Sequence, residues 1–491
     1  MSNQDLVNYL TECGVCQMCQ LRYLKSRGNE YQDIKQSFKN LDLKYSDIIC
    51  NNDDELPKKK QRSNVCTTCL GLFSKEFQEK LIAAILKQGL EEHECSSIVV
   101  AISTPIILQV RQLSMWFALR QKFEHINTER PPDVPLKEAI KLIINPILCE
   151  KLHKNYDVNG IMISVTLMHN QNSEEISNLE KLNKHLYREK HENQQMSRVW
   201  IEKHYTPGIV DVDLYKKFIT VPPPIPNDSL YITSISVTGP TVYIAGRYRK
   251  LSRKLSHTPW LLNGIRVMED SVEEIIIRSI VPHFCAEQSK IIFMSSGRED
   301  VDVRCLGKGR PFVLEIPNAH RTKLIKKDAF MMESNIEKSL QISVRDLQTA
   351  MREETVHIKT GEEKKHKFYR ALCKLEEPVT IDVLEKLNLP EGFLIDQKTP
   401  LRVLHRRPLL TRPRRIHSLR ARVCQNNLKA VILDVVTQAG TYVKELVHGD
   451  FGRTSPSITS IIGKPIDIIS LDVIAVGLEW PAEVDNSLIN D

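Results

Sequence analysis

The residues best suited to chemistry in this sequence lie in a short charged segment, residues 297–304, which reads GREDVDVR. Its three carboxylates and two arginines could form a structural ion pair, the commoner outcome for an isolated charged cluster. They could also serve an active site, because a carboxylate near a buried sheet is costly unless a cation neutralises it. If Glu299, Asp300 and Asp302 bound magnesium together, the protein would be a metal-dependent nuclease.

Apolar stretches flank this charged segment and predict the elements that position it. Residues 291–293 precede it and residues 311–316 follow it, a pattern typical of a strand, a turn and a second strand beside a buried sheet. Residues 367–373 and 431–436 predict two further strands. Tyr369, at the centre of the first of these, could be a core residue whose hydroxyl is satisfied.

Two stretches of the chain are strongly basic and contain no acid, residues 239–260 and residues 401–422. A solvated charged face usually mixes both signs, so these stretches predict a polyanionic partner, DNA or RNA. Tyr248 and Trp260 are interleaved with the first set of charges and offer rings for base stacking. The basic residues that we expect at this interface are Arg247, Arg249, Lys250, Arg406 and Arg407.

Cysteines near the N-terminus have the spacing of metal ligands. Those that form C-x-x-C pairs are Cys13, Cys16, Cys19, Cys66 and Cys69. Two such pairs complete a four-sulfur structural zinc site, and unmetallated buried thiols are the alternative. The spacing alone leaves open which pair of the first trio is used, and Cys50 is a further candidate.

The composition predicts a globular, intracellular protein. Of its 491 residues, 41% are apolar and 26% are charged, and the formal net charge is +7. The polar, acidic N-terminus predicts no signal peptide, and no apolar run is long enough to span a bilayer. We therefore expect the protein in the nucleus and cytoplasm, where its 12 cysteines stay mostly reduced.

Composition and periodicity divide the chain into four parts. Residues 1–72 carry the cysteine pairs and include a polar loop at residues 51–62. Residues 73–221 form an α+β accessory region, residues 222–229 a stiff proline linker, and residues 230–491 hold the charged segment and both basic stretches. The accessory elements that we predict are helices at 74–89, 108–119 and 173–195 and strands at 98–102 and 161–167.

The last of these four parts resembles the pseudouridine synthases at three places. Residues 297–300 (GRED) resemble the G-R-x-D motif that carries the aspartate of these enzymes. Tyr369 sits where their second motif places an aromatic residue, and residues 440–446 (GTYVKEL) resemble the third motif, whose basic residue is Lys444 here. The match is closest to the archaeal and eukaryotic Pus-ten branch, which modifies the T arm of tRNA. The residues that match this branch are 245–248, 397–408 and 437–454.

This resemblance implies an α+β catalytic domain with a mixed, largely antiparallel sheet flanked by helices. Asp300 would be the nucleophile, and Lys444 would pair with it and lower its pKa. Tyr369 would stack on the uracil and take part in the final proton removal, while Tyr442 would line the same pocket. Arg298 would fill the gap left by the flipped uridine or hold its phosphate. The reaction needs no cofactor and no catalytic metal.

The resemblance also implies a partner and a structural metal. The substrate would be tRNA, possibly with other structured RNA, at uridine fifty-four or fifty-five of the T loop, and no membrane would be involved. The accessory region would combine a THUMP-type RNA-binding part with a zinc ion. In that branch the first C-x-x-C pair precedes x-L-R-aromatic, which selects Cys16 and Cys19 to join Cys66 and Cys69. A non-catalytic RNA-binding or RNA-processing factor is the main alternative.

Overall fold

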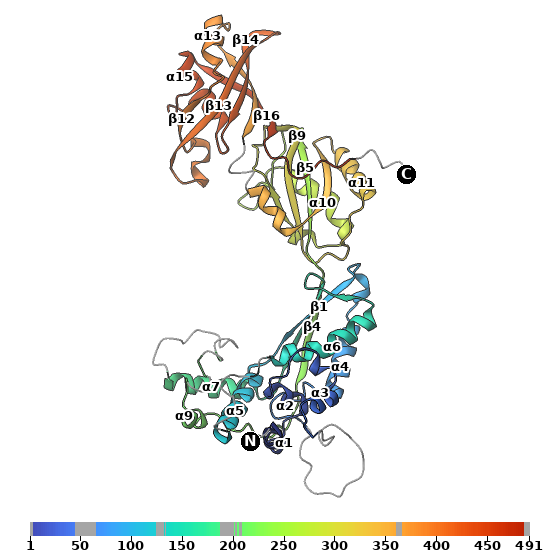
Figure 1. Ribbon diagram of the computed structural model, residues 1–491. Coiled ribbons are helices and arrows are strands. Elements are labelled where there is room, and N and C mark those ends of the chain that lie inside the picture. The colour runs from blue at the N-terminus through green and yellow to red at the C-terminus, as the bar shows by residue number, and fades with distance from the viewer. Residues whose placement is uncertain are drawn as a thin grey trace. The chain divides into compact units, whose positions relative to one another are not determined.

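The computed structural model describes residues 3–44, 65–123, 132, 134–186, 201, 204–205, 209–359 and 366–485. The chain forms two compact units, Met1–Gly239 and Pro240–Asp491 (Figure 1). Cys50 and the loop predicted at residues 51–62 lie outside the described residues. Within the described part, no helix combines the length and the apolar character that a membrane span needs.

The first unit packs helices against a four-stranded sheet with the strand order β2-β1-β3-β4. Its strands are β1 (Ser97–Ser103), β2 (Asn155–Tyr156), β3 (Ile161–Met168) and β4 (Tyr231–Thr238). Its helices are α1 (Asn3–Glu12), α2 (Gln17–Tyr23), α3 (Ile34–Asn40), α4 (Lys75–Leu86), α5 (Ile106–Lys122), α6 (Leu136–Leu152), α7 (Asn172–Leu186) and α9 (Val212–Lys216). Ser74 accepts a hydrogen bond from the amide of Phe77 and caps α4, as its place before an apolar-periodic stretch predicts.

The boundary between the two units lies after Gly239, whereas the sequence pattern places the start of the second region at residue 230. Strand β4 pairs antiparallel with β3, so it completes the sheet of the first unit. The proline segment 222–229 also packs in this unit, where Arg111 donates a hydrogen bond to the carbonyl of Pro224. A strand pattern identifies a strand but does not show which sheet it joins.

The second unit is built on a ten-stranded sheet with the order β10-β5-β9-β16-β11-β14-β13-β12-β15, and β8 pairs with β9. Its strands are β5 (Val242–Lys250), β8 (Ile292–Ser295), β9 (Arg304–Ile316), β10 (Ile342–Ala350), β11 (Lys367–Leu375), β12 (Phe393–Lys398), β13 (Thr411–Cys424), β14 (Asn427–Thr437), β15 (Thr454–Ser455) and β16 (Ile466–Val476). Its α-helices are α10 (Val272–Ile280), α11 (Lys326–Glu337), α13 (Ile381–Leu387), α14 (Val443–His448) and α15 (Ile458–Ile462). The predicted α+β class with a mixed, largely antiparallel sheet is confirmed.

Two apolar cores cover this sheet, and the charged segment lies where its two halves join. One core is formed by β5, β9 and β10 with α10 and α11, and the other by β11 to β16 with α13 to α15 (Figure 1). Strands β8 and β9 flank the charged segment and pair antiparallel, with Ser295 opposite Phe312, as predicted. At the end of the segment, Arg304 pairs in parallel with Asp472 of β16, which links the two halves.

Candidate active site

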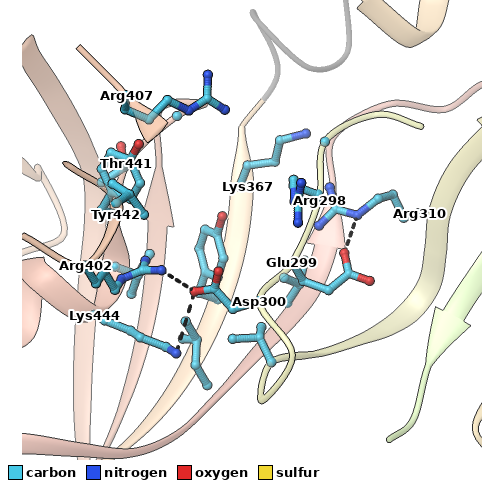
Figure 2. A pocket seen from close by; sticks show the side chains of 18 residues that line it. Arg298, Glu299, Asp300, Arg310, Lys367, Arg402, Arg407, Thr441, Tyr442 and Lys444 are labelled. Atoms are coloured by element: carbon cyan, nitrogen blue, oxygen red, sulfur yellow. Dashed lines mark hydrogen bonds and ion pairs between the residues drawn. The ribbon is translucent and has the colours of Figure 1, made fainter. Parts of the chain in front are cut away.

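A cavity of about 470 Å³ opens beside the charged segment (Figure 2). Its walls come from the turn between β8 and β9, from β11 and β16, from the short helix η6 (Leu401–Arg406), and from the start of α14. Of the residues predicted to form the site, it brings together Arg298, Asp300, Tyr369, Arg407, Tyr442 and Lys444. Segments that lie far apart in the sequence therefore meet around one concave space, which is the usual setting for a substrate site.

The three carboxylates of the charged segment diverge and take separate roles. Glu299 is buried and accepts hydrogen bonds from Arg310 at 2.9 Å and from the hydroxyl of Tyr248 at 3.2 Å. Glu299 therefore forms the structural ion pair that the sequence offered as an alternative. Asp302 accepts hydrogen bonds from Lys444. Within the described residues, the group that could hold a metal ion consists of four cysteines, and Glu299, Asp300 and Asp302 are not among them.

Asp300 is the carboxylate that faces the cavity, with about a third of its side chain exposed (35%). Two cations hold it, Nη1 of Arg402 at 2.8 Å and Nζ of Lys444 at 3.6 Å. Lys444 makes its closer contacts to the two oxygens of Asp302, at 2.7 and 2.8 Å. Partial burial disfavours the charge of Asp302, but these hydrogen bonds lower its pKa below the ordinary value.

Two tyrosines and two exposed arginines line the rest of the cavity. Burial raises the pKa of Tyr369, which keeps its hydroxyl protonated at neutral pH. The backbone of Tyr442 is fixed because its amide donates to the side chain of Gln397 at 2.8 Å. Arg298 and Arg407 are exposed and lie beside the opening, where Figure 2 shows Arg407 on the α14 side and Arg298 near Arg310. The side chain of the predicted Arg406 lies outside the described part of the chain.

Sequence reasoning missed Arg402 and Lys367 as residues of the cavity. Arg402 lies in η6, within a basic stretch that we interpreted only as an RNA-binding surface. Lys367 precedes Tyr369 by two positions on β11, and both line the cavity. Residues two apart on a strand share a face, so the placement of Tyr369 was a signal that could have identified Lys367. For Arg402 no local pattern marks a contact with Asp300, about a hundred residues away in the chain.

Arg247 and Lys250, which we predicted as RNA-binding residues, are buried and bind backbone carbonyls of the second unit. Both lie on β5, which has β10 on one side and β9 on the other, and both are buried. Arg247 donates to the carbonyls of Gly309 at 3.2 Å and Trp480 at 3.1 Å, and also to that of Leu478. Tyr248 is also fully buried and unavailable for stacking on a base. Arg249 is half-buried and donates to the hydroxyl of Ser343 at 2.8 Å.

Lys250 instead supports the turn that carries Asp300. Its ammonium donates to the carbonyls of Asp300 at 2.9 Å, Val301 at 2.7 Å and Val303 at 2.8 Å. Burial lowers the pKa of Lys250 to about 8, so the ammonium predominates at neutral pH. Its three hydrogens then satisfy three carbonyls of one turn, which fixes the backbone on both sides of the carboxylate.

We expect the substitution Lys250→Met to lower turnover by about 100-fold, because a displaced catalytic group can cost that much. The three carbonyls would lose the ammonium as a donor, and amide hydrogen exchange in residues 300–304 should accelerate. Lys254→Met is the matched control, since Lys254 is exposed four residues further on. Hydrogen exchange with mass spectrometry and a turnover assay measure both effects. Equal exchange and turnover in the two variants would contradict the supporting role of Lys250.

A second chemical site lies in the first unit, where the four selected cysteines come together. The Sγ atoms of Cys16, Cys19, Cys66 and Cys69 all lie within 4.8 Å of one another, and all four residues are buried. The amide of Cys16 also donates to Sγ of Cys66 at 3.2 Å, and Sγ of Cys16 lies 3.8 Å from that of Cys69. Cys13 is only partly buried and is not in this group. Four converging thiols fit a tetrahedral metal ion.

The largely antiparallel sheet and the cavity in which an aspartate, a tyrosine and a lysine meet are features of a pseudouridine synthase. Residues 243–477 match the family model described as "Pus10, C-terminal", and residues 66–237 match "Eukaryotic Pus10, N-terminal". The chain is 56% identical to the putative tRNA pseudouridine synthase Pus10 of Drosophila melanogaster, over 99% of each chain. The chain therefore belongs to the Pus10 family of tRNA pseudouridine synthases.

Two more distant relatives carry the same name but match smaller parts of the chain. The tRNA pseudouridine synthase Pus10 of Homo sapiens is 38% identical, over 87% of this chain and 81% of the human chain. That of Pyrococcus furiosus is 38% identical over 48% of this chain and 57% of its own. Among solved structures, a Cbf5-Nop10-Gar1 complex aligns with 46% of this chain and 47% of its own at 16% identity, with a TM-score of 0.25.

Proposed function

We propose that this enzyme converts uridine fifty-four, uridine fifty-five or both in the T loop of tRNA to pseudouridine, with Asp300 as the nucleophile. The observation that carries the proposal is the placement of Asp300, a carboxylate at the cavity surface with Arg402 and Lys444 beside it. The two cations orient this carboxylate and compensate its charge in a partly closed site. An ionised carboxylate is the form that can attack a sugar carbon.

The isomerisation balances without a cofactor. Attack by Asp300 on C1′ forms a bond to oxygen and breaks the bond from C1′ to N1, whose electron pair stays on the uracil. The uracil rotates, C5 attacks C1′, and Asp300 leaves as a carboxylate. The proton on C5 is then removed and N1 takes a proton from solvent. Tyr369 lies in the same cavity, where its ring can stack on the uracil and its hydroxyl can assist the proton transfer.

The target uridine must leave its base stack to reach Asp300. Arg298 and Arg407 are exposed beside the cavity and would bind the phosphates that flank the flipped nucleotide. The family membership supports tRNA as the substrate, and the sequence motifs of residues 397–408 and 437–454 support the T arm. A loop of this arm presents unpaired bases on a folded RNA, which is what such enzymes recognise.

We further propose that the four cysteines hold a structural zinc ion, because thiolate sulfur in a closed tetrahedral set is the preferred structural environment of zinc. The first unit would then serve as a THUMP-type RNA-binding part that contacts the tRNA away from the chemistry. The enzyme would act in the nucleus and cytoplasm. The zinc ion has no role in the reaction, since all groups used above belong to the second unit.

The release of tritium from tRNA labelled at C5 of uridine tests the proposed substrate, because this hydrogen leaves only when C5 joins C1′. We expect release from the unmodified transcript and its loss when both T-loop uridines are replaced by cytidine. Transcripts with a single replacement assign the modified position. Undiminished release from the doubly replaced transcript would contradict the T-loop assignment.

A further inference from the structure

We infer that Arg402 is a second catalytic cation, which holds one oxygen of Asp300 and leaves the other to attack the uridine, and that the buried Glu445 positions it. This inference rests on the proposed function, because it assigns a role within the same site. The residue that the sequence motifs mark as the partner of Asp300 is Lys444. Arg402 lies closer to the nucleophile, at 2.8 Å against 3.6 Å.

The two cations approach the same atom of Asp300. The closest contact of Arg402 and that of Lys444 both fall on Oδ2, as the converging dashed lines in Figure 2 show. The positive charge is therefore concentrated at one end of the carboxylate. Oδ1 remains as the oxygen less engaged by cations, and it is the better placed of the two to form the bond to C1′.

Lys444 makes its closer contacts to Asp302, whereas Arg402 contacts Asp300 directly and is held by a second carboxylate, Glu445. The hydrogen bonds of Lys444 go to both oxygens of Asp302, at 2.7 and 2.8 Å. Arg402 uses Nε to bind Oε1 of Glu445 at 2.6 Å and presents Nη1 to Asp300. Because the guanidinium is planar and its donors are fixed relative to each other, the bond to Glu445 sets the direction of Nη1.

The side chain of Glu445 binds and orients the guanidinium of Arg402. Glu445 follows Lys444 on α14, and its side chain is only 2% exposed. Its Oε2 has no hydrogen-bond partner among the residues that the structure describes, and its Oε1 accepts from Arg402. A buried carboxylate without a cation is costly, and the pair is therefore held together. The ring of Tyr442, 5.8 Å from the guanidinium, gives Arg402 a further neighbour.

The chemistry gives Arg402 a role in both halves of the reaction. Before attack it holds Asp300 in place through Oδ2, and it stays on Oδ2 while Oδ1 bonds to C1′. When C5 attacks C1′ and the bond from C1′ to Oδ1 breaks, the electron pair returns to the carboxylate. The guanidinium then stabilises the charge that develops on this leaving group.

Arg402→Ala is expected to lower kcat by about 100- to 1000-fold, the usual effect of removing one preorganised donor from developing charge. Added guanidinium ion should raise the kcat of this variant by at least about tenfold. The rescue should stay below wild-type kcat, because a free cation must still be positioned. The kcat of Arg402→Lys should fall between those of wild type and Arg402→Ala. Arg278→Ala is the matched control, because Arg278 also pairs with an aspartate, Asp270 at 2.7 Å, on the exposed surface of α10. It should keep wild-type turnover with or without guanidinium.

The double variant isolates the role of Glu445. If Glu445 acts by positioning Arg402, Glu445→Gln lowers kcat in the wild type but adds no further loss in the Arg402→Ala background. A purely structural role would give losses that multiply. Arg402→Gln, which keeps a donor to Glu445 without the charge, takes the place of Arg402→Ala if that variant does not fold.

Turnover by Arg402→Ala within about threefold of wild type would overturn the inference, since that difference is near the error of additivity in such comparisons. A large loss that guanidinium does not restore, in a protein whose melting matches wild type, would also overturn it. Wild-type turnover and its loss in Asp300→Asn report on the proposed function. The ratio between Arg402→Ala and wild type reports on this inference alone.

Discussion

Asp300→Asn is expected to reduce pseudouridine formation by about 10⁴- to 10⁶-fold, the range seen when the nucleophile of an enzyme is lost. The amide has the shape of the carboxylate but cannot attack C1′. It faces the cavity and Arg402 in the same place, so the pocket should keep its form. Binding of tRNA, measured by filter retention, should change little, because the phosphate contacts lie on other residues.

Asp302→Asn provides the comparison within the same turn. Asp302 holds Lys444 through two hydrogen bonds but makes no bond to the substrate in the proposed reaction. Its loss should lower turnover by only about tenfold, because Lys444 keeps its contact to Asp300. Asp300→Asn with turnover near that of Asp302→Asn would show that Asp300 is not the nucleophile.

Cys69→Ser is expected to remove the metal and unfold the first unit. Structural zinc binding contributes about 10–16 kcal/mol in small domains, which is as large as the whole stability of most domains, about 5–15 kcal/mol. The four cysteines belong to the larger of the two apolar cores of this unit. The pair Cys66–Cys69 is also tied to α5, because Arg111 donates to the carbonyl of Thr67 at 3.0 Å. Loss of the metal would therefore destabilise α5 and, through it, the sheet.

Metal content and thermal melting measure this effect directly. Wild type should contain one zinc ion per chain and lose one melting transition when a chelator removes it. Cys13→Ser is the matched control, because Cys13 lies outside the four-sulfur group and should keep both the metal and the transition. A Cys69→Ser protein with full metal content and unchanged melting would contradict the four-sulfur site.

Features that depend on local sequence could be predicted. The strand, turn and strand around Asp300 follow from apolar stretches on each side of a charged segment. Ser74 signals the start of α4 because a hydroxyl before an apolar-periodic stretch can bind the free amides of the first turn. The C-x-x-C spacing indicates a cysteine group, because it brings two thiolates to one metal, and the family resemblance selects Cys16 and Cys19 over Cys13.

Features that depend on contacts between distant segments could not be predicted. The basic residues of β5 lie in a stretch without acidic residues, which is typical of an exposed basic surface. Lys250 is nevertheless directed inward and donates to carbonyl oxygens of the turn at Asp300. Carbonyls are present in every residue, so no pattern of side chains shows that such partners exist. The same limit applies to Arg402, whose partners Asp300 and Glu445 lie in other segments of the chain.

The central claim is that this protein makes pseudouridine in the T loop of tRNA, and base-by-base mapping of an unmodified tRNA transcript tests it most directly. After incubation with the wild-type protein, carbodiimide treatment and primer extension locate each pseudouridine. The account predicts a new stop at uridine fifty-four, uridine fifty-five or both, and none with Asp300→Asn. A protein that binds the transcript but leaves every T-loop uridine unchanged would contradict it and favour a non-catalytic RNA-binding role.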